Sequence, residues 1–221
     1  MRRIYGSPWL SPQVPTALSV CILALGFASG LPLSPAAQAD RVAARSKGRP
    51  DAPVVMYEMS DFQCPYCRDF TLETMPSLER EYIRSGKVRL IFINFPLTGV
   101  HPHAMAAAEV AMCAALQGKF WPVHDRLFQR QPQWAERQDP GPYLLTLADS
   151  AGVDHARLIA CVVRRVTRPA IEADAAAARR AGARSTPTFY IEGGLIEGAA
   201  PLAVFREALD SVYRRKTASA R

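Results

Sequence analysis

The 221-residue sequence contains only five cysteines, no long unbroken apolar run and no block of basic residues. Lys and Arg number 27 against 20 Asp and Glu, so the formal net charge is +7. The cations are spread along the chain without a strip of aromatic residues among them, which argues against nucleic-acid binding. With 49% hydrophobic and 21% charged residues, the chain can bury a core and is typical of one globular domain with room for an insertion.

The first 39 residues have the pattern of an export signal. Arg2 and Arg3 form a positive start, residues 17–33 are mostly apolar, and small residues surround Gln38. This pattern predicts cleavage between Ala39 and Asp40, and hence a location in the periplasm or cell envelope.

The alternative for this segment is an uncleaved membrane anchor. Gly26, Gly30 and Pro32 interrupt the apolar stretch, which is shorter than the roughly 20 apolar residues that a spanning helix needs. Cleavage is therefore favoured, and Cys21 would be lost with the signal. Four cysteines would remain, an even number in a chain sent to an oxidising compartment.

A βαβ unit is predicted early in the mature chain. Residues 54–59 have strand propensity, and apolar residues recur at helical spacing over 70–83. Residues 88–94 form a nearly continuous apolar run, as in a strand covered on both faces. Cys64 therefore lies where a strand passes into a helix, and Pro76 is expected to kink that helix or to break one of its hydrogen bonds.

The remaining segments are predicted from periodicity and from turn residues. Residues 40–53 read as a flexible tether, and 98–183 as an inserted helical domain with helices near 101–116, 121–128, 142–151, 154–163 and 169–181. A hairpin of 188–191 and 195–197 and a helix over 202–213 complete an α/β domain made of residues 54–97 and 184–215. Residues 216–221 are expected to be a frayed tail.

The sequence Cys64-Pro65-Tyr66-Cys67 at a helix start has specific chemical consequences. Unpaired N–H groups and the helix dipole stabilise a thiolate there, which lowers the pKa of the first cysteine. Cys67 follows one turn later, close enough to form a disulfide. We expect Cys64 to be the exposed sulfur that forms a mixed disulfide, and Cys67 to be the buried sulfur that resolves it.

Two other interpretations of the pair are weaker. A metal site needs a second cysteine pair or suitably spaced histidines, and the sequence has neither, so no metal or other cofactor is expected. A purely structural disulfide would close a very short loop and stabilise little. His101-Pro102-His103 could suggest a metal pair, but His101 is expected to cap a helix with Pro102 in its first turn.

Several motifs together resemble a known family. The chain is similar to the DsbA-like thiol–disulfide oxidoreductases of the bacterial exported branch in the segments Glu58-x5-Cys64-Pro65-Tyr66-Cys67, Asp61-Phe62-Gln63, Gly118-Lys119-Phe120-Trp121 and Ser185-Thr186-Pro187-Thr188-Phe189. The resemblance implies an α/β thioredoxin fold with a helical domain inserted between its βαβ and ββα halves. It covers residues 54–213.

The resemblance also implies roles for three further residues. Pro187 would be a cis residue facing the dithiol, and Thr186 would hold a substrate strand by backbone hydrogen bonds. Without the dithiol upstream, an ordinary turn before a strand would explain Thr186-Pro187 equally well. Glu58 would be a buried acid that exchanges a proton with Cys67. The alternative for Glu58 is a solvated residue of an edge strand.

Cys113 and Cys161 both fall on predicted helices of the insertion, among apolar neighbours. We predict a buried structural disulfide between them, and two separate free thiols are the alternative.

The sequence thus predicts an exported oxidoreductase that donates the Cys64–Cys67 disulfide to reduced, folding proteins. The resemblance implies reoxidation by a DsbB-like or VKOR-like membrane partner, and a monomer is expected. Tyr66 departs from the histidine found in strongly oxidising members, and it supplies no cation to stabilise the thiolate. The redox direction therefore stays open, with an envelope reductase of the thioredoxin type and a non-catalytic peptide-binding chaperone as alternatives.

Overall fold

The computed structural model describes residue 40 and residues 42–219. The predicted export signal lies outside these described residues. Among them, no helix is both long enough and apolar enough to cross a membrane.

A five-stranded mixed sheet forms the centre of the fold, in the order β1-β3-β2-β4-β5. The parallel pair β2 (Val54–Ser60) and β3 (Val88–Asn94) lies in the middle, in register from Val54 opposite Val88 to Ser60 opposite Asn94. The hairpin of β4 (Thr188–Ile191) and β5 (Gly194–Glu197) adds antiparallel to β2. The βαβ unit and the hairpin are confirmed, and β3 has the predicted bounds.

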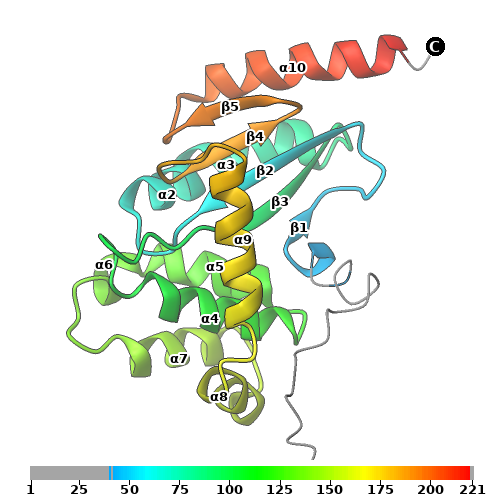
Figure 1. Ribbon diagram of the computed structural model, residues 1–221. Coiled ribbons are helices and arrows are strands. Elements are labelled where there is room, and N and C mark those ends of the chain that lie inside the picture. The colour runs from blue at the N-terminus through cyan, green and yellow to red at the C-terminus, as the bar shows by residue number, and fades with distance from the viewer. Residues whose placement is uncertain (1–39, 41, 220–221) are drawn as a thin grey trace, which may run out of the picture. The chain divides into compact units, whose positions relative to one another are not determined.

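Between β3 and β4 the chain forms a helical insertion, in agreement with the predicted fold class. Its helices are α4 (Ala104–Ala115), α5 (Phe120–Gln129), α6 (Gln131–Trp134), α7 (Gly141–Ser150), α8 (His155–Val163) and α9 (Arg168–Arg180). Figure 1 shows α9 running from the other helices of the insertion toward the sheet. The short helix α6 is not predicted from the sequence, because four residues are too few to show a helical period.

Separate apolar clusters cover the two faces of the sheet and fill the insertion. On one face, the sheet packs against the helix that follows the cysteines and against α10 (Leu202–Ser219), with Phe189 of β4 beside Phe70 and Phe205. On the other face, Met59 and Phe95 pack against the alanines of α9. The largest cluster belongs mainly to the insertion but also contains Phe62, Cys64, Cys67 and Phe92. The two cysteines therefore pack against the core of the insertion.

The helix after Cys64 accommodates Pro76 by widening rather than by breaking. It runs as α2 (Pro65–Asp69), η1 (Phe70–Thr74), α3 (Met75–Leu78) and η2 (Glu79–Ile83), in which η1 and η2 are π-helical. The Met75 N–H donates to the Phe70 carbonyl five residues back. The wide turn lies directly before the proline, which has no N–H of its own to donate.

The segment 40–53 differs from the flexible tether predicted for it. Strand β1 (Ser46–Lys47) pairs antiparallel with β3 at Ile91 and Leu90. Before it, the buried guanidinium of Arg45 donates to the Phe92 carbonyl and forms an ion pair with Asp174 of α9. This polar segment is thus held by backbone pairing and an ion pair. Such contacts produce no periodic pattern of apolar residues, so the sequence does not reveal them.

The C-terminal helix also runs further than the sequence indicates. Helix α10 continues to Ser219, where a frayed tail is predicted from residue 216. Lys216 forms an ion pair with Glu192 at 2.9 Å, and the Thr217 hydroxyl donates to the Tyr213 carbonyl. These polar contacts hold a helical end that has little apolar pattern.

Candidate active site

The end of β2 and the start of α2 together place Cys64. The strand ends at Ser60, and the Cys64 N–H then donates to the Asp61 carbonyl at 3.1 Å, which turns the chain. Cys64 is the N-cap of α2 with extended backbone angles, and Pro65 begins the helix. Proline suits the first turn, whose N–H groups have no partner within the helix. Both Cys64 and Cys67 are free thiols in this structure.

The surroundings of Cys64 favour its thiolate. A hydrogen bond from Cys67 is the largest effect, and Thr186 and the backbone N–H groups of Cys67 and Tyr66 add to it. Burial opposes these interactions, and the net result lowers the pKa of Cys64 to about 6. At neutral pH the Cys64 thiol is therefore mostly ionised, which makes it both a nucleophile and a good leaving group.

Cys67 has the opposite character. Its side chain is completely buried, and burial together with the neighbouring Cys64 sulfur raises the pKa of Cys67 well above its usual range. The Asp61 N–H lies 3.4 Å from Cys67 Sγ. The two sulfurs one helical turn apart are thus a thiolate and a protonated thiol.

Cys64 is less exposed than the sequence analysis predicts. Only 3% of the residue is accessible, and its sulfur lies 3.2 Å from the Thr186 carbonyl oxygen, which accepts the S–H when the thiol is protonated. Pro65 and Tyr66 are instead the exposed residues of the motif, and 63% of the surface of Tyr66 is accessible. The hydrogen-bond donors around Cys64 and the complete burial of Cys67 together distinguish the two cysteines.

The Thr186–Pro187 segment lies against the dithiol although it is more than 120 residues away in sequence. The Thr186–Pro187 peptide bond is cis. The Thr186 carbonyl faces Cys64 Sγ, and the Pro187 carbonyl accepts a hydrogen bond from the Gly198 N–H at 2.7 Å. The fold therefore brings together the two motifs that the resemblance links.

Glu58 lies inside the molecule rather than on a solvated edge. It is 1% exposed on the central strand β2, opposite Phe92 and Phe189 of the flanking strands. Burial raises the pKa of Glu58 to about 7, against smaller opposing effects of the Ser60 hydroxyl and the Lys47 charge. Its Oε1 atom has no hydrogen-bond partner. A carboxyl in this state can take up or release a proton near neutral pH.

A buried carboxylate that the sequence analysis did not assign holds the turn before Cys64. Asp61 accepts hydrogen bonds from the N–H groups of Gln63 and Leu97, both at 2.8 Å. Its Oδ2 also lies 2.8 Å from Nδ1 of His101. The predicted capping role of His101 is therefore wrong: α4 begins only at Ala104, and the imidazole pairs with Asp61 across 40 residues of chain.

Two buried glutamines contact the same turn. Gln63 Oε1 accepts the His103 N–H at 2.6 Å, and Gln63 Nε2 donates to the Ala135 carbonyl at 2.7 Å. Gln131 of α6 donates to the carbonyls of Phe62 and Cys64. Asp61 and Gln63 stand beside Cys64 in the sequence and could have been singled out, whereas nothing local marks Gln131.

A shallow pocket lies beside this turn. It has a volume of about 260 Å³, and its lining includes Pro65, Val100, His103 and Glu136. Val100 is 72% exposed, so an apolar side chain stands at its edge. The pocket adjoins the segment that connects the two cysteines.

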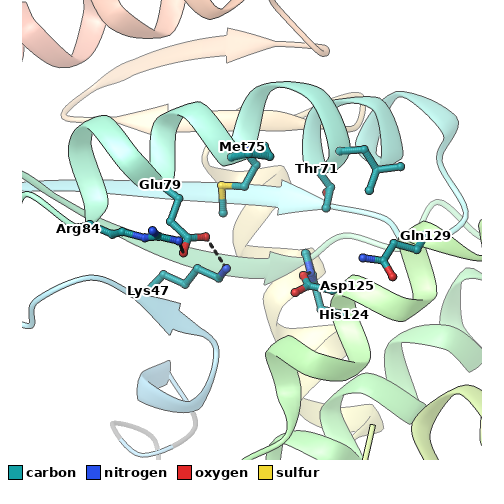
Figure 2. Close-up of a pocket in the computed structure, with 10 residues that line it drawn as sticks. Lys47, Thr71, Met75, Glu79, Arg84, His124, Asp125 and Gln129 are labelled. Carbon is teal, nitrogen blue, oxygen red and sulfur yellow. Dashed lines mark hydrogen bonds and ion pairs between the residues drawn. The ribbon is translucent and has the colours of Figure 1, made fainter. Parts of the chain in front are cut away.

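Another pocket, drawn in Figure 2, lies between the helix that follows the cysteines and α5. It has a volume of about 350 Å³, and polar side chains that line it contact one another: Lys47 forms an ion pair with Glu79 at 2.7 Å, and His124 Nδ1 lies 2.9 Å from the Asp125 carboxylate. None of its lining residues belongs to the predicted site. In the described part of the chain, no group of three His, Cys, Asp or Glu side chains is arranged to hold a metal ion.

Cys113 of α4 and Cys161 of α8 are joined by a disulfide, with their Cα atoms 5.9 Å apart. Both residues are buried in the core of the insertion, and Cys113 Sγ also lies 3.7 Å from the Thr167 hydroxyl. The bond ties the first helix of the insertion to a late one. It is separate from the Cys64–Cys67 pair.

The fold and the dithiol define the class of protein as a thioredoxin-fold thiol–disulfide oxidoreductase. A helical insertion packs against its active-site turn. Comparison with known proteins agrees. The family model described as thioredoxin matches residues 41–211. A relative from Bacillus anthracis, named probable disulfide bond formation protein D, is 31% identical over 153 residues, which are 68% of this chain and 70% of that protein.

Solved structures share the same fold. Oxidised BdbD from Bacillus subtilis superimposes with a TM-score of 0.70 at 24% identity, covering 78% of this chain and 95% of that one. The α-DsbA1 protein from Wolbachia pipientis gives a TM-score of 0.71 at 22% identity, covering 80% of this chain and 94% of that one. The chain therefore belongs to the thioredoxin family, within its DsbA-like thiol–disulfide oxidoreductases.

Proposed function

We propose that this protein is an exported oxidase that donates a Cys64–Cys67 disulfide to reduced, folding proteins. The observation that carries the proposal is the contrast between the two sulfurs, since the pKa of Cys64 is lowered to about 6 while that of buried Cys67 is raised. A stabilised Cys64 thiolate favours the dithiol form of the enzyme. An enzyme whose reduced form is stabilised is an oxidant of its substrates.

In the proposed reaction, a substrate thiolate attacks Cys64 Sγ of the oxidised enzyme. The Cys64–Cys67 bond breaks, a mixed disulfide forms at Cys64, and the Cys67 sulfur leaves with the electron pair and takes up a proton. A second substrate thiolate then attacks the substrate sulfur of the mixed disulfide and releases Cys64 as a thiolate. The substrate loses two electrons, and the enzyme dithiol gains them.

Other residues of the site have supporting roles in this proposal. Glu58 supplies the proton to Cys67, because its carboxyl is buried on β2, the strand that leads to the dithiol, and has a pKa of about 7. The Thr186 backbone pairs with an extended substrate segment, beside Pro187. Pro65 and exposed Tyr66 form the surface that this segment contacts.

The cellular context follows from the N-terminal sequence and from the family. Residues 1–39 act as a cleaved export signal that sends the chain to the periplasm or cell envelope. A DsbB-like or VKOR-like membrane protein accepts the two electrons and restores the disulfide. The enzyme works as a monomer, without a metal or other cofactor.

The first test is the equilibrium reduction potential of the Cys64–Cys67 pair against glutathione, in the chain from Asp40 with the Cys113–Cys161 disulfide intact. A value of about −120 to −180 mV supports the oxidase, whereas one near about −270 mV overturns it in favour of an envelope reductase. A Cys64→Ser variant that kept full function in an exporting cell would instead identify a peptide-binding chaperone.

A further inference from the structure

The helical insertion holds the reactive turn through a short helix. Both ends of α6 contact this turn: the Gln131 side chain at its start, and the Ala135 carbonyl directly after its last residue, Trp134. Trp134 is fully buried, and its indole N–H donates to the Leu127 carbonyl at 2.9 Å. Helix α6 is therefore fixed to the insertion, and the groups that it presents to the turn have little freedom to move.

Gln131 makes the closest link to the reactive cysteine. Its Nε2 donates one hydrogen to the Phe62 carbonyl at 2.8 Å and the other to the Cys64 carbonyl at 3.0 Å. The residue is 4% exposed, so no bulk water competes for these two carbonyls. The Cys64 carbonyl also accepts the Arg68 N–H, the first hydrogen bond of the helix.

We propose that Gln131 is a positioning residue through which the helical insertion stabilises the thiolate of Cys64 and so makes the dithiol more oxidising. Its two N–H groups fix the Phe62–Gln63 and Cys64–Pro65 peptide planes, and these planes set the direction of the turn into α2. Its amide also offsets the negative ends of two carbonyl dipoles near the sulfur. The inference rests on the proposed role of Cys64 and Cys67 as the exchanging pair.

The test compares Gln131→Met, which keeps the length of the side chain but removes both donors, with the wild type. The matched control is Gln117→Met, because Gln117 also bridges two segments of the insertion, through the backbone of Asp154, but contacts nothing in the turn. The equilibrium constant for reduction of the protein disulfide by glutathione should fall roughly threefold to tenfold in Gln131→Met, a shift of about 14 to 30 mV. It should stay unchanged in Gln117→Met.

A merely structural role gives a different result. In that case Gln131→Met lowers the melting temperatures of the oxidised and reduced proteins equally and leaves the glutathione equilibrium at its wild-type value, which would overturn the inference. If the wild type itself does not exchange with glutathione, the proposed function fails as well. The two failures are therefore distinguishable.

A second measurement does not depend on the folding of a variant. In the reduced wild-type protein, the side-chain amide resonances of Gln131 should exchange slowly with water and should shift with pH at the same midpoint as the ionisation of Cys64. The Gln117 amide, on the exposed side of the insertion, serves as the internal control. A Gln131 amide that exchanges rapidly, or that does not follow Cys64, would contradict the proposal.

Discussion

Two cysteines with the same covalent structure differ in acidity because the fold gives them different surroundings. Cys64 has N–H and thiol donors directed at its sulfur, whereas Cys67 is enclosed by the core and lies next to a negative charge. A group whose pKa is lowered in the folded state adds stability above its unfolded pKa and loses it as the pH falls through the folded value. The free energy of unfolding of the reduced protein, relative to that of the oxidised protein, should therefore rise as the pH is raised from about 6 to about 9.

The pH dependence of alkylation tests this assignment. Iodoacetamide should modify Cys64 of the reduced protein with a half-maximal rate near pH 6, because only the thiolate reacts. Cys67 should react slowly over the same range, since its pKa is raised and its sulfur is buried. Mass spectrometry of the modified peptide identifies the reacting residue. A half-maximal rate near pH 8.5 would show that the site does not stabilise the thiolate.

The raised pKa of Glu58 predicts that stability changes with pH in the direction opposite to the effect of Cys64. Its folded pKa of about 7 lies above the unfolded value, so the folded state is penalised as the pH rises through that range. Glu58→Gln should stabilise the protein by up to about 3 kcal/mol at pH 8 and by very little at pH 4. Urea denaturation at the two pH values measures the difference, and the exposed residue Glu73 gives the control variant Glu73→Gln. Equal effects at both pH values would refute the buried, neutral carboxyl.

At the scale of elements, the edge strand β1 illustrates how a polar segment is held in place. Arg45 reaches the carbonyl of Phe92 on β3 and the carboxylate of Asp174 on α9, and Asp174 also accepts the side-chain amide of Asn94 at 2.8 Å. One guanidinium therefore connects the N-terminal segment, the sheet and the last helix of the insertion.

Removing this guanidinium should be costly, because it leaves the carboxylate of Asp174 largely buried without its cation. We expect Arg45→Met to lower the free energy of unfolding by about 3 to 5 kcal/mol. Arg49→Met is the matched control, since Arg49 pairs with Asp51 on the surface, and its loss should have little effect on stability. Urea titration of both variants gives the comparison. Similar small losses would mean that β1 is held by its backbone pairing alone.

At the scale of the whole molecule, the chain contains two cysteine pairs with separate tasks. The Cys113–Cys161 bond closes a loop of 48 residues within the insertion, while the free pair lies where the insertion meets the sheet. Loss of the long-range bond should therefore affect stability far more than redox chemistry.

The double variant Cys113→Ala/Cys161→Ala tests this division. Its free energy of unfolding should fall by about 4 kcal/mol, from the loop entropy that the bond removes from the unfolded chain. The pH midpoint for alkylation of Cys64 should remain that of the parent. A shift of that midpoint by more than about half a pH unit would show that the two pairs are coupled through the insertion.

The sequence by itself determined the features that depend on near neighbours. The period of apolar residues indicated β3 and the long helices, and two cysteines one turn apart at a strand-to-helix junction indicated the dithiol. Motifs around Cys64 and Pro187 indicated the family. Each of these signals lies within a few residues, where backbone geometry couples neighbouring side chains directly.

Only the tertiary structure decided the features that depend on distant partners. The burial of Glu58 required strands β3 and β4 on either side of it, and the ordering of residues 45–47 required β3 and Asp174. The pairing of Asp61 with His101 spans 40 residues, and the contact of Gln131 with Cys64 spans 67. Hydrogen bonds and desolvation act through space over a few ångströms. The sequence around a polar residue therefore does not indicate which distant residue the fold will place beside it.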